Sequence, residues 1–163
     1  MFKNKYRFKN FIIYRLTSNL VSNDYLESLN DKSYSSNLVD QKSYTFEELK
    51  KYADDNISDK NFLLIIYDQA ISSYVGNIRI SIYDSFTGGF GRLVYKKFKG
   101  KGYGSLFNEI MKDINRNFFK LKKIKSEAKT SNVGSIISHL KSKPTKDYIR
   151  NNMHYFEWEF NFR

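Results

Sequence analysis

The chain has 163 residues, of which 40% are hydrophobic and 17% aromatic; this argues against a disordered chain and predicts one folded domain over residues 1–163. It contains no cysteine and two histidines, which excludes disulfides and thiolate metal ligands, and we expect no metal site. The net charge of +11 favours an anionic partner such as nucleic acid, a membrane face or a phosphate-rich ligand, although a general preference for lysine explains the charge as well.

Two stretches bear on membrane association. The longest apolar run, residues 62–67, is too short to span a bilayer. The basic N-terminus is followed at residues 11–14 by too few apolar residues for a signal peptide. The sequence therefore predicts a soluble, cytoplasmic protein without a membrane partner.

Periodicity along the chain predicts elements in the order β-α-α-β-β-β-α-β-α-β. Thr45 with Glu48 forms a capping box that opens a helix. Residues 84–89 have turn chemistry that ends in a Gly-Gly pair. The predicted strands cover residues 8–16, 62–68, 76–83, 90–95, 123–129 and 153–160, and the predicted helices cover residues 23–29, 45–55, 102–119 and 133–140. We expect an α/β (α+β) fold, in which a mixed sheet carries helices on its faces.

A basic, glycine-rich loop joins the strand predicted at 90–95 to the helix predicted at 102–119. Its alternating glycines let backbone N–H groups approach a bulky anion, and the helix N-terminus adds a partial positive charge. Four lysines add full charges: Lys96, Lys97, Lys99 and Lys101. The loop therefore predicts a pyrophosphate site, and the alternative is a turn that only joins the strand to the helix.

Other phosphate- and nucleic-acid-binding motifs fit this loop less well. The Gly-Lys-Ser/Thr ending of a P-loop is absent, and the spacing is Gly-x-Gly-x-Gly after several strands, not the Gly-x-Gly-x-x-Gly of an early Rossmann unit. Residues 101–107 superficially resemble the RNP1 motif of RNA-recognition domains, but that motif must lie on a strand, and the residues that follow have helical period. RNA binding stays as the alternative from another class, and we do not expect a nucleic-acid partner.

The same loop and the segment after it resemble the GCN5-related N-acetyltransferase (GNAT) superfamily. The family signature, Gln/Arg-x-x-Gly-x-Gly/Ala, is matched by residues 99–104, with Lys99 in place of Gln or Arg. Residues 127–139 are similar to the family's fifth strand and following helix. Residues 15–31 are similar to a subgroup that includes ribosomal-protein N-terminal and amino-sugar (nonulosonic acid pathway) acetyltransferases, with Ser28 in place of a common Trp.

The resemblance implies a GNAT (acyl-CoA N-acyltransferase) fold, whose twisted sheet is split between its fourth and fifth strands to hold acetyl-CoA. Backbone groups before the loop would bind the pantetheine arm, and the Val94 N–H would polarise the thioester carbonyl. Backbone N–H groups of the loop would hold the pyrophosphate. The implied cofactor-binding residues are Arg92, Leu93, Val94, Lys99, Gly100, Lys101, Gly102, Tyr103, Gly104, Ser105 and Asn132.

Two catalytic residues are also implied. Glu127 would deprotonate the acceptor amine through a water, and His139, as an imidazolium, would protonate the departing CoA thiolate. Structural alternatives stand beside these roles, because Glu127 on a strand could face solvent and His139 on a helix could be a packing residue. Tyr83 and Asp84 are alternative pocket residues.

The implied function is transfer of acetyl from acetyl-CoA to a primary amine, without a metal. An amino-sugar nucleotide is the favoured acceptor because the resemblance around Asn30 and Asp31 points to it, and its phosphates also suit the positive charge of the chain. A protein N-terminus or lysine is the alternative, followed by a polyamine or an antibiotic. A homodimer is left open.

Overall fold

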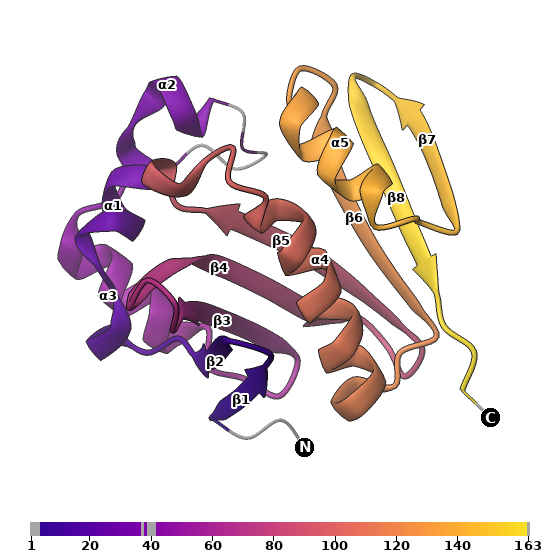
Figure 1. Ribbon diagram of the computed structural model, residues 1–163, viewed down its shortest axis with the longest axis horizontal. Helices are drawn as coiled ribbons and strands as arrows, with labels where there is room; N and C mark the ends of the chain where they lie inside the picture. The colour runs from indigo at the N-terminus through magenta and orange to yellow at the C-terminus, as the bar shows by residue number, and fades with distance from the viewer. Residues whose placement is uncertain (1–3, 37, 39–41, 163) are drawn as a thin grey trace.

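The computed structural model describes residues 4–36, 38 and 42–162. Over these residues the strands form one sheet in the order β1-β2-β3-β4-β5-β6-β8-β7 (Figure 1). The strands are β1 (Lys5–Phe8), β2 (Phe11–Arg15), β3 (Asn61–Asp68), β4 (Ser73–Ile82), β5 (Thr87–Val94), β6 (Lys123–Lys129), β7 (Lys146–Arg150) and β8 (Met153–Glu159). The helices are α1 (Asn23–Asn30), α2 (Lys32–Ser35), α3 (Phe46–Asp55), α4 (Tyr103–Ile114) and α5 (Val133–Lys141), with short 3-10 turns η1 (Ser18–Leu20) and η2 (Lys96–Phe98) and a π-helical turn η3 (Asn115–Phe119).

Helices cover both faces of the sheet. From Gly76 onward in β4, and in β5, odd-numbered residues face α1 and α3: the Arg79 guanidinium lies 5.5 Å above the Tyr52 ring of α3, and the Tyr95 ring, just beyond β5, stacks on Tyr25 of α1. Even-numbered residues face α4, which lies across the sheet in Figure 1 with α5 beside it. Ile78 and Ile80 pack there against the buried side of α4, and all of these side chains have 0% exposure. None of the described helices has the length and hydrophobicity needed to cross a membrane.

The predicted mixed α/β architecture is confirmed. The capping box of α3 is present, since the Thr45 hydroxyl accepts from the Glu48 N–H (3.2 Å) and the Glu48 carboxylate accepts from the Thr45 N–H (2.8 Å). The other predicted helices and strands are present within a few residues of their predicted bounds, with the exceptions below.

Two hairpins are missing from the sequence prediction. The strand predicted at 8–16 is the β1–β2 hairpin, whose two-residue turn holds Lys9 at a φ of 53°. β7 was not predicted because all its residues are exposed, which leaves no hydrophobic alternation. Its turn to β8 has Asn151 and Asn152 at φ values of 50° and 60°, as a type I′ turn requires.

Two smaller predictions were wrong, and one short helix was missed. The helix predicted to reach residue 119 is α-helical only to Ile114 and continues as the π-helical turn η3, where the buried Asn115 side chain bonds both backbone groups of Leu121. Gly88 and Gly89 belong to β5 and not to the preceding turn. The short helix α2 was not predicted.

Candidate functional site

β5 and β6 lie side by side only at their N-terminal ends. Three residue pairs, from Thr87 with Lys123 to Gly89 with Lys125, form their parallel ladder, and the two strands then diverge (Figure 1). By contrast, β4 with β5 and β6 with β8 are each paired over seven residues. The predicted split is therefore present, but the unpredicted N-terminal hairpin makes its strands the fifth and sixth.

Backbone groups of β5 point into this split. The Tyr95 N–H donates to the Val75 carbonyl (2.9 Å), and the alternation of an antiparallel ladder then directs the Leu93 backbone groups to β4 and those of Arg92 and Val94 into the split. The Val94 carbonyl accepts there from the Tyr34 hydroxyl (2.5 Å). Of the three predicted backbone partners of a pantetheine arm, Leu93 is thus wrong, because its N–H and C=O face the neighbouring strand.

The glycines of the basic loop have two different roles. Gly100 and Gly102 have φ values of 78° and 86°, and a Cβ added to either would have no other atom within 4 Å. They therefore supply a left-handed backbone next to open space at the N-terminus of α4, where Gly102 is the N-cap. Gly104 instead permits close packing of α4 on α5, since a Cβ there would lie 3.0 Å from the Ser138 hydroxyl.

The four lysines of the loop are not equivalent. Lys96 and Lys97 form ion pairs with carboxylates of α1 and of its C-cap, Asp31. Lys99 and Lys101 lie over aromatic rings and have no ion pair within the described part of the chain. The prediction that all four charges serve an anion is therefore wrong for the first two, which are already neutralised.

The Arg92 side chain joins α4 to α5. Its guanidinium donates only to uncharged groups: the Gly104 carbonyl, Asn108 Oδ1 (2.6 Å), Ser138 Oγ (2.6 Å), the Ser135 carbonyl (3.0 Å) and Ser135 Oγ (3.3 Å). Burial lowers the pKa of Arg92 to about 9, and no described carboxylate pairs with it. A cation without a counter-ion therefore lies between two helix N-termini, an arrangement that favours a bound anion. The sequence interpretation used only the backbone of Arg92 and missed this role.

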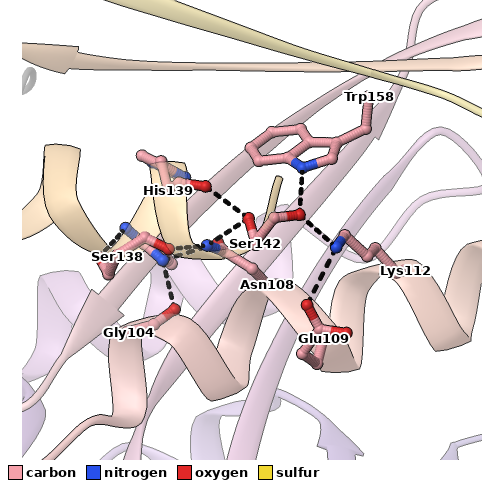
Figure 2. Close-up of polar contacts among 9 residues, drawn as sticks. Gly104, Asn108, Glu109, Lys112, Ser138, His139, Ser142 and Trp158 are labelled. Atoms are coloured by element: carbon pink, nitrogen blue, oxygen red, sulfur yellow. Dashed lines mark hydrogen bonds and ion pairs between the residues drawn. The ribbon is translucent and has the colours of Figure 1, made fainter. Parts of the chain in front are cut away.

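Further hydrogen bonds fix α5 on α4 (Figure 2). The Asn108 amide donates to the Ser138 carbonyl (2.8 Å) and to the Ser142 hydroxyl (3.1 Å). The Ser142 carbonyl in turn accepts from Lys112 and from the Trp158 indole. At the other end of α5, Asn132 is the N-cap, as its predicted position at the helix start implies, and its side chain accepts from the Ser135 N–H (3.2 Å).

Two cavities meet at the split. The first, of about 360 Å³, lies at the N-termini of α4 and α5 and is lined by every predicted cofactor-binding residue except Lys101. The second, of about 570 Å³, reaches the face that α1 and α3 cover. The residues common to both are Leu38, Arg92, Leu93, Asn132 and Ser135. One molecule on each face could therefore meet the other through the split.

The two predicted catalytic residues line the second cavity from different sides of β6. Glu127 is exposed on β6 beside Tyr155 and has no hydrogen bond or ion pair to another described residue. His139, on α5, is 1% exposed; its Nε2 lies 3.4 Å from the Ser126 hydroxyl, and its Nδ1 has no hydrogen-bond partner in the part of the chain that the structure describes. Burial and the nearby Arg92 charge lower the pKa of His139 to about 2. The expectation that His139 is an imidazolium at neutral pH is therefore wrong.

Two other sequence expectations change. Asp84 does not line either cavity, because its carboxylate accepts from the backbone N–H groups of its own turn, whereas the exposed Tyr83 lies at the second cavity. The RNP1-like residues lie on the loop and on α4, where Phe107 has 0% exposure and the Tyr103 hydroxyl donates to Asp68 (2.8 Å). Phe107 is packed inside the protein and Tyr103 is partly buried, so the two rings do not form a base-stacking surface.

The low pKa of His139 predicts a loss of stability in mild acid. The folded protein keeps this ring neutral down to about pH 2, whereas the unfolded chain takes up a proton below about pH 6.5. Lowering the pH from 7 to 5 should therefore cost about 2 kcal/mol of unfolding free energy through this group. Urea titrations at both pH values test this, and His139→Phe should reduce the pH dependence by that amount. An unchanged pH dependence in His139→Phe would contradict the prediction.

Neither a scan against models of known protein families nor a search of curated proteins found a match. Solved structures do match over nearly the whole chain. They include a GNAT-family acetyltransferase from Bacillus anthracis (16% identity, TM-score 0.79, 95% of this chain and 98% of that one) and a ribosomal-protein-S5-alanine acetyltransferase from Vibrio fischeri (12%, 0.75, 95% and 96%). A third is spermidine N-acetyltransferase from Vibrio cholerae in complex with CoA and spermine (13%, 0.72, 91% and 95%). The chain therefore has the GNAT fold.

Proposed function

We propose that this chain, which has the GNAT fold, is a cytoplasmic enzyme that transfers an acetyl group from acetyl-CoA to a primary amine. The observation that carries the proposal is the split between β5 and β6, at which the cavity beside the glycine-rich loop meets a second cavity from the other face. Two separate spaces that share a wall are what a transfer between two substrates requires, because the reacting groups must come into contact.

In this proposal the first cavity holds acetyl-CoA. The N-terminus of α4, with its unpaired N–H groups, and the free cations Lys99 and Lys101 bind the pyrophosphate. Backbone groups of Arg92 and Val94 bind the pantetheine arm in the split, and the Val94 N–H stabilises the developing oxyanion. Asn132, at the start of α5, contacts the cofactor from the opposite side of the split.

Acyl transfer also needs a base for the amine and a proton for the departing thiolate. Glu127 is the base that we propose, acting through a water, since its exposed carboxylate lines the second cavity without another partner among the described residues. His139 does not serve as the acid, because its buried ring stays neutral at neutral pH. In the proposed step the proton that Glu127 takes from the amine is the one that the departing CoA thiolate finally gains, through water.

The second cavity holds the acceptor. Its volume of about 570 Å³ is within the usual range for small-molecule sites. Among the described residues, four cations line it, against the single carboxylate of Glu127: Lys42, Arg79, Arg92 and Lys125. This excess of cations favours an anionic amine, so we propose an amino-sugar nucleotide before a protein N-terminus, and a polyamine such as spermidine is disfavoured.

Calorimetry with acetyl-CoA and desulfo-CoA in moderate salt tests the cofactor assignment. We expect micromolar binding to the wild-type chain and a loss of about tenfold or more in the double variant Lys99→Met with Lys101→Met, because the variant removes both loop cations that have no ion pair among the described residues. The double variant Lys60→Met with Lys146→Met removes the same charge from residues that line neither cavity, and should bind as the wild type does. No binding to the wild type at millimolar ligand would overturn the proposed function.

A further inference from the structure

The floor of the second cavity is a part of the sheet that includes Gly91, a position without a side chain. On β5, Gly91 is exposed, and a Cβ added to it would meet only the Arg79 Cβ, at 4.0 Å. The register pairs Arg79 with Gly91 and Asn77 with Leu93, so these four residues lie together on the face that α1 and α3 cover. A larger residue at position 91 would fill the part of the second cavity that lies beside Arg79.

Two polar side chains on this floor have unmet hydrogen-bonding capacity. Arg79 is half-buried, stacks on the Tyr52 ring, and makes no hydrogen bond or ion pair with any described residue. Asn77 is 3% exposed, and neither its Oδ1 nor its Nδ2 has a hydrogen-bond partner among the described residues. Buried amides are almost always hydrogen-bonded, and an unpaired one costs about 1–3 kcal/mol. Neighbouring side chains with this property indicate a place where a ligand supplies the missing partners.

The charge around the floor indicates which ligand. Lys42 and Lys125 line the same cavity as Arg79. The Lys125 ammonium comes no closer than 4.0 Å to its nearest described carboxylate, that of Glu157, so its charge is weakly paired. Within the described part of the chain, Glu127 is the one carboxylate that lines the cavity, and it lies at the split and on a different strand from Arg79. A guanidinium binds a phosphoryl group through two parallel hydrogen bonds, a geometry for which ammonium groups are less suited.

We infer that Arg79 and Asn77 form a subsite for a phosphoryl group carried by the acceptor. The inference rests on the proposed function and deepens it, because it assigns the residues that select the acceptor. Leu93 lines both cavities and marks the place of the amine. Its partner on β4 is Asn77, and the Cα atom of Arg79 lies two residues further along that strand, roughly 7 Å from the Cα atom of Asn77. One sugar ring bridges that distance, so the phosphoryl group at Arg79 positions the amine at the split.

Matched amines test the subsite: glucosamine, glucosamine 6-phosphate and UDP-glucosamine. With CoA present, we expect NMR titrations to show at least about tenfold tighter binding of a phosphorylated amine than of glucosamine. The two phosphorylated amines distinguish a phosphate ester from a nucleotide diphosphate as the source of the group. Arg79→Met should remove this preference and leave the affinity for acetyl-CoA and for glucosamine unchanged, and Arg79→Lys should restore part of it.

Two more variants make the test specific. Arg150→Met removes the same charge from exposed β7 and should keep the preference. Gly91→Leu should block all three amines without affecting acetyl-CoA, because it fills only the second cavity. The inference is overturned when acetyl-CoA binds but no phosphorylated amine does, or when Arg79→Met keeps the preference. Failure of acetyl-CoA to bind the wild type identifies a failure of the proposed function instead.

Discussion

Replacing Arg92 with methionine should weaken acetyl-CoA binding by about tenfold or more and lower the free energy of unfolding by about 2 kcal/mol. The affinity falls because an uncompensated cation beside two helix N-termini is removed. The stability falls because acceptors on α4 and α5, among them the Asn108 side chain, lose their donor. Removing a poorly solvated charge offsets part of that loss, which keeps the expected value moderate.

Calorimetry and urea unfolding measure the two effects separately. Arg92→Lys is the informative control, because a single ammonium keeps the charge but cannot reach all the acceptors that the planar guanidinium bonds. We expect it to recover most of the affinity and little of the stability. Wild-type affinity in Arg92→Met would show that this guanidinium does not contribute to the anion site.

Gly76→Ala should destabilise the fold by about 3 kcal/mol, whereas Gly91→Ala should leave stability within about 0.5 kcal/mol of the wild type. The same methyl group meets opposite surroundings at these two strand positions. At Gly76 its carbon would lie 2.2 Å from the Leu93 carbonyl and 2.6 Å from the Phe107 ring, so β4, β5 and α4 would have to separate. At Gly91 it would be at ordinary contact distance from Arg79.

Thermal and urea unfolding of the two variants, measured side by side, decide this prediction. Since α4 carries the proposed pyrophosphate site, Gly76→Ala should also reduce acetyl-CoA affinity, and Gly91→Ala should not. Equal stabilities of the two variants would mean that the sheet can relax around residue 76, and that the close approach of α4 is not required.

The centre of the chain could be predicted because its signals are local. The strand before residue 95, the glycines after it and the helical period from residue 106 lie in one continuous stretch, and the loop at the N-terminus of α4 is what they specify. Asn132 could be placed at the start of α5 for the same reason. The β1–β2 and β7–β8 hairpins could not, because their turns lack glycine and β7 has no buried side.

The chemistry of the site depended on pairs that are distant in sequence. In the sequence, Lys96 and Lys97 have no carboxylate nearby. Their partners lie on α1 and at its C-cap, more than sixty residues earlier, and only the fold brings them together. Arg92 finds its partners on α4 and α5, and nothing near it in the sequence indicates them. His139 has an ordinary helical context, and only its burial against Phe156 and Trp158 shows that the ring stays neutral at neutral pH.

The short ladder between β5 and β6 also has a mechanical consequence. The sheet consists of one antiparallel part, β1 to β5, and a smaller part, β6, β8 and β7, joined by three residue pairs at one end. That junction contains Gly88 and Gly89, so it is the natural hinge between the two parts. Both cavities have walls on each side of the hinge. Any rotation about it would therefore change the two spaces together.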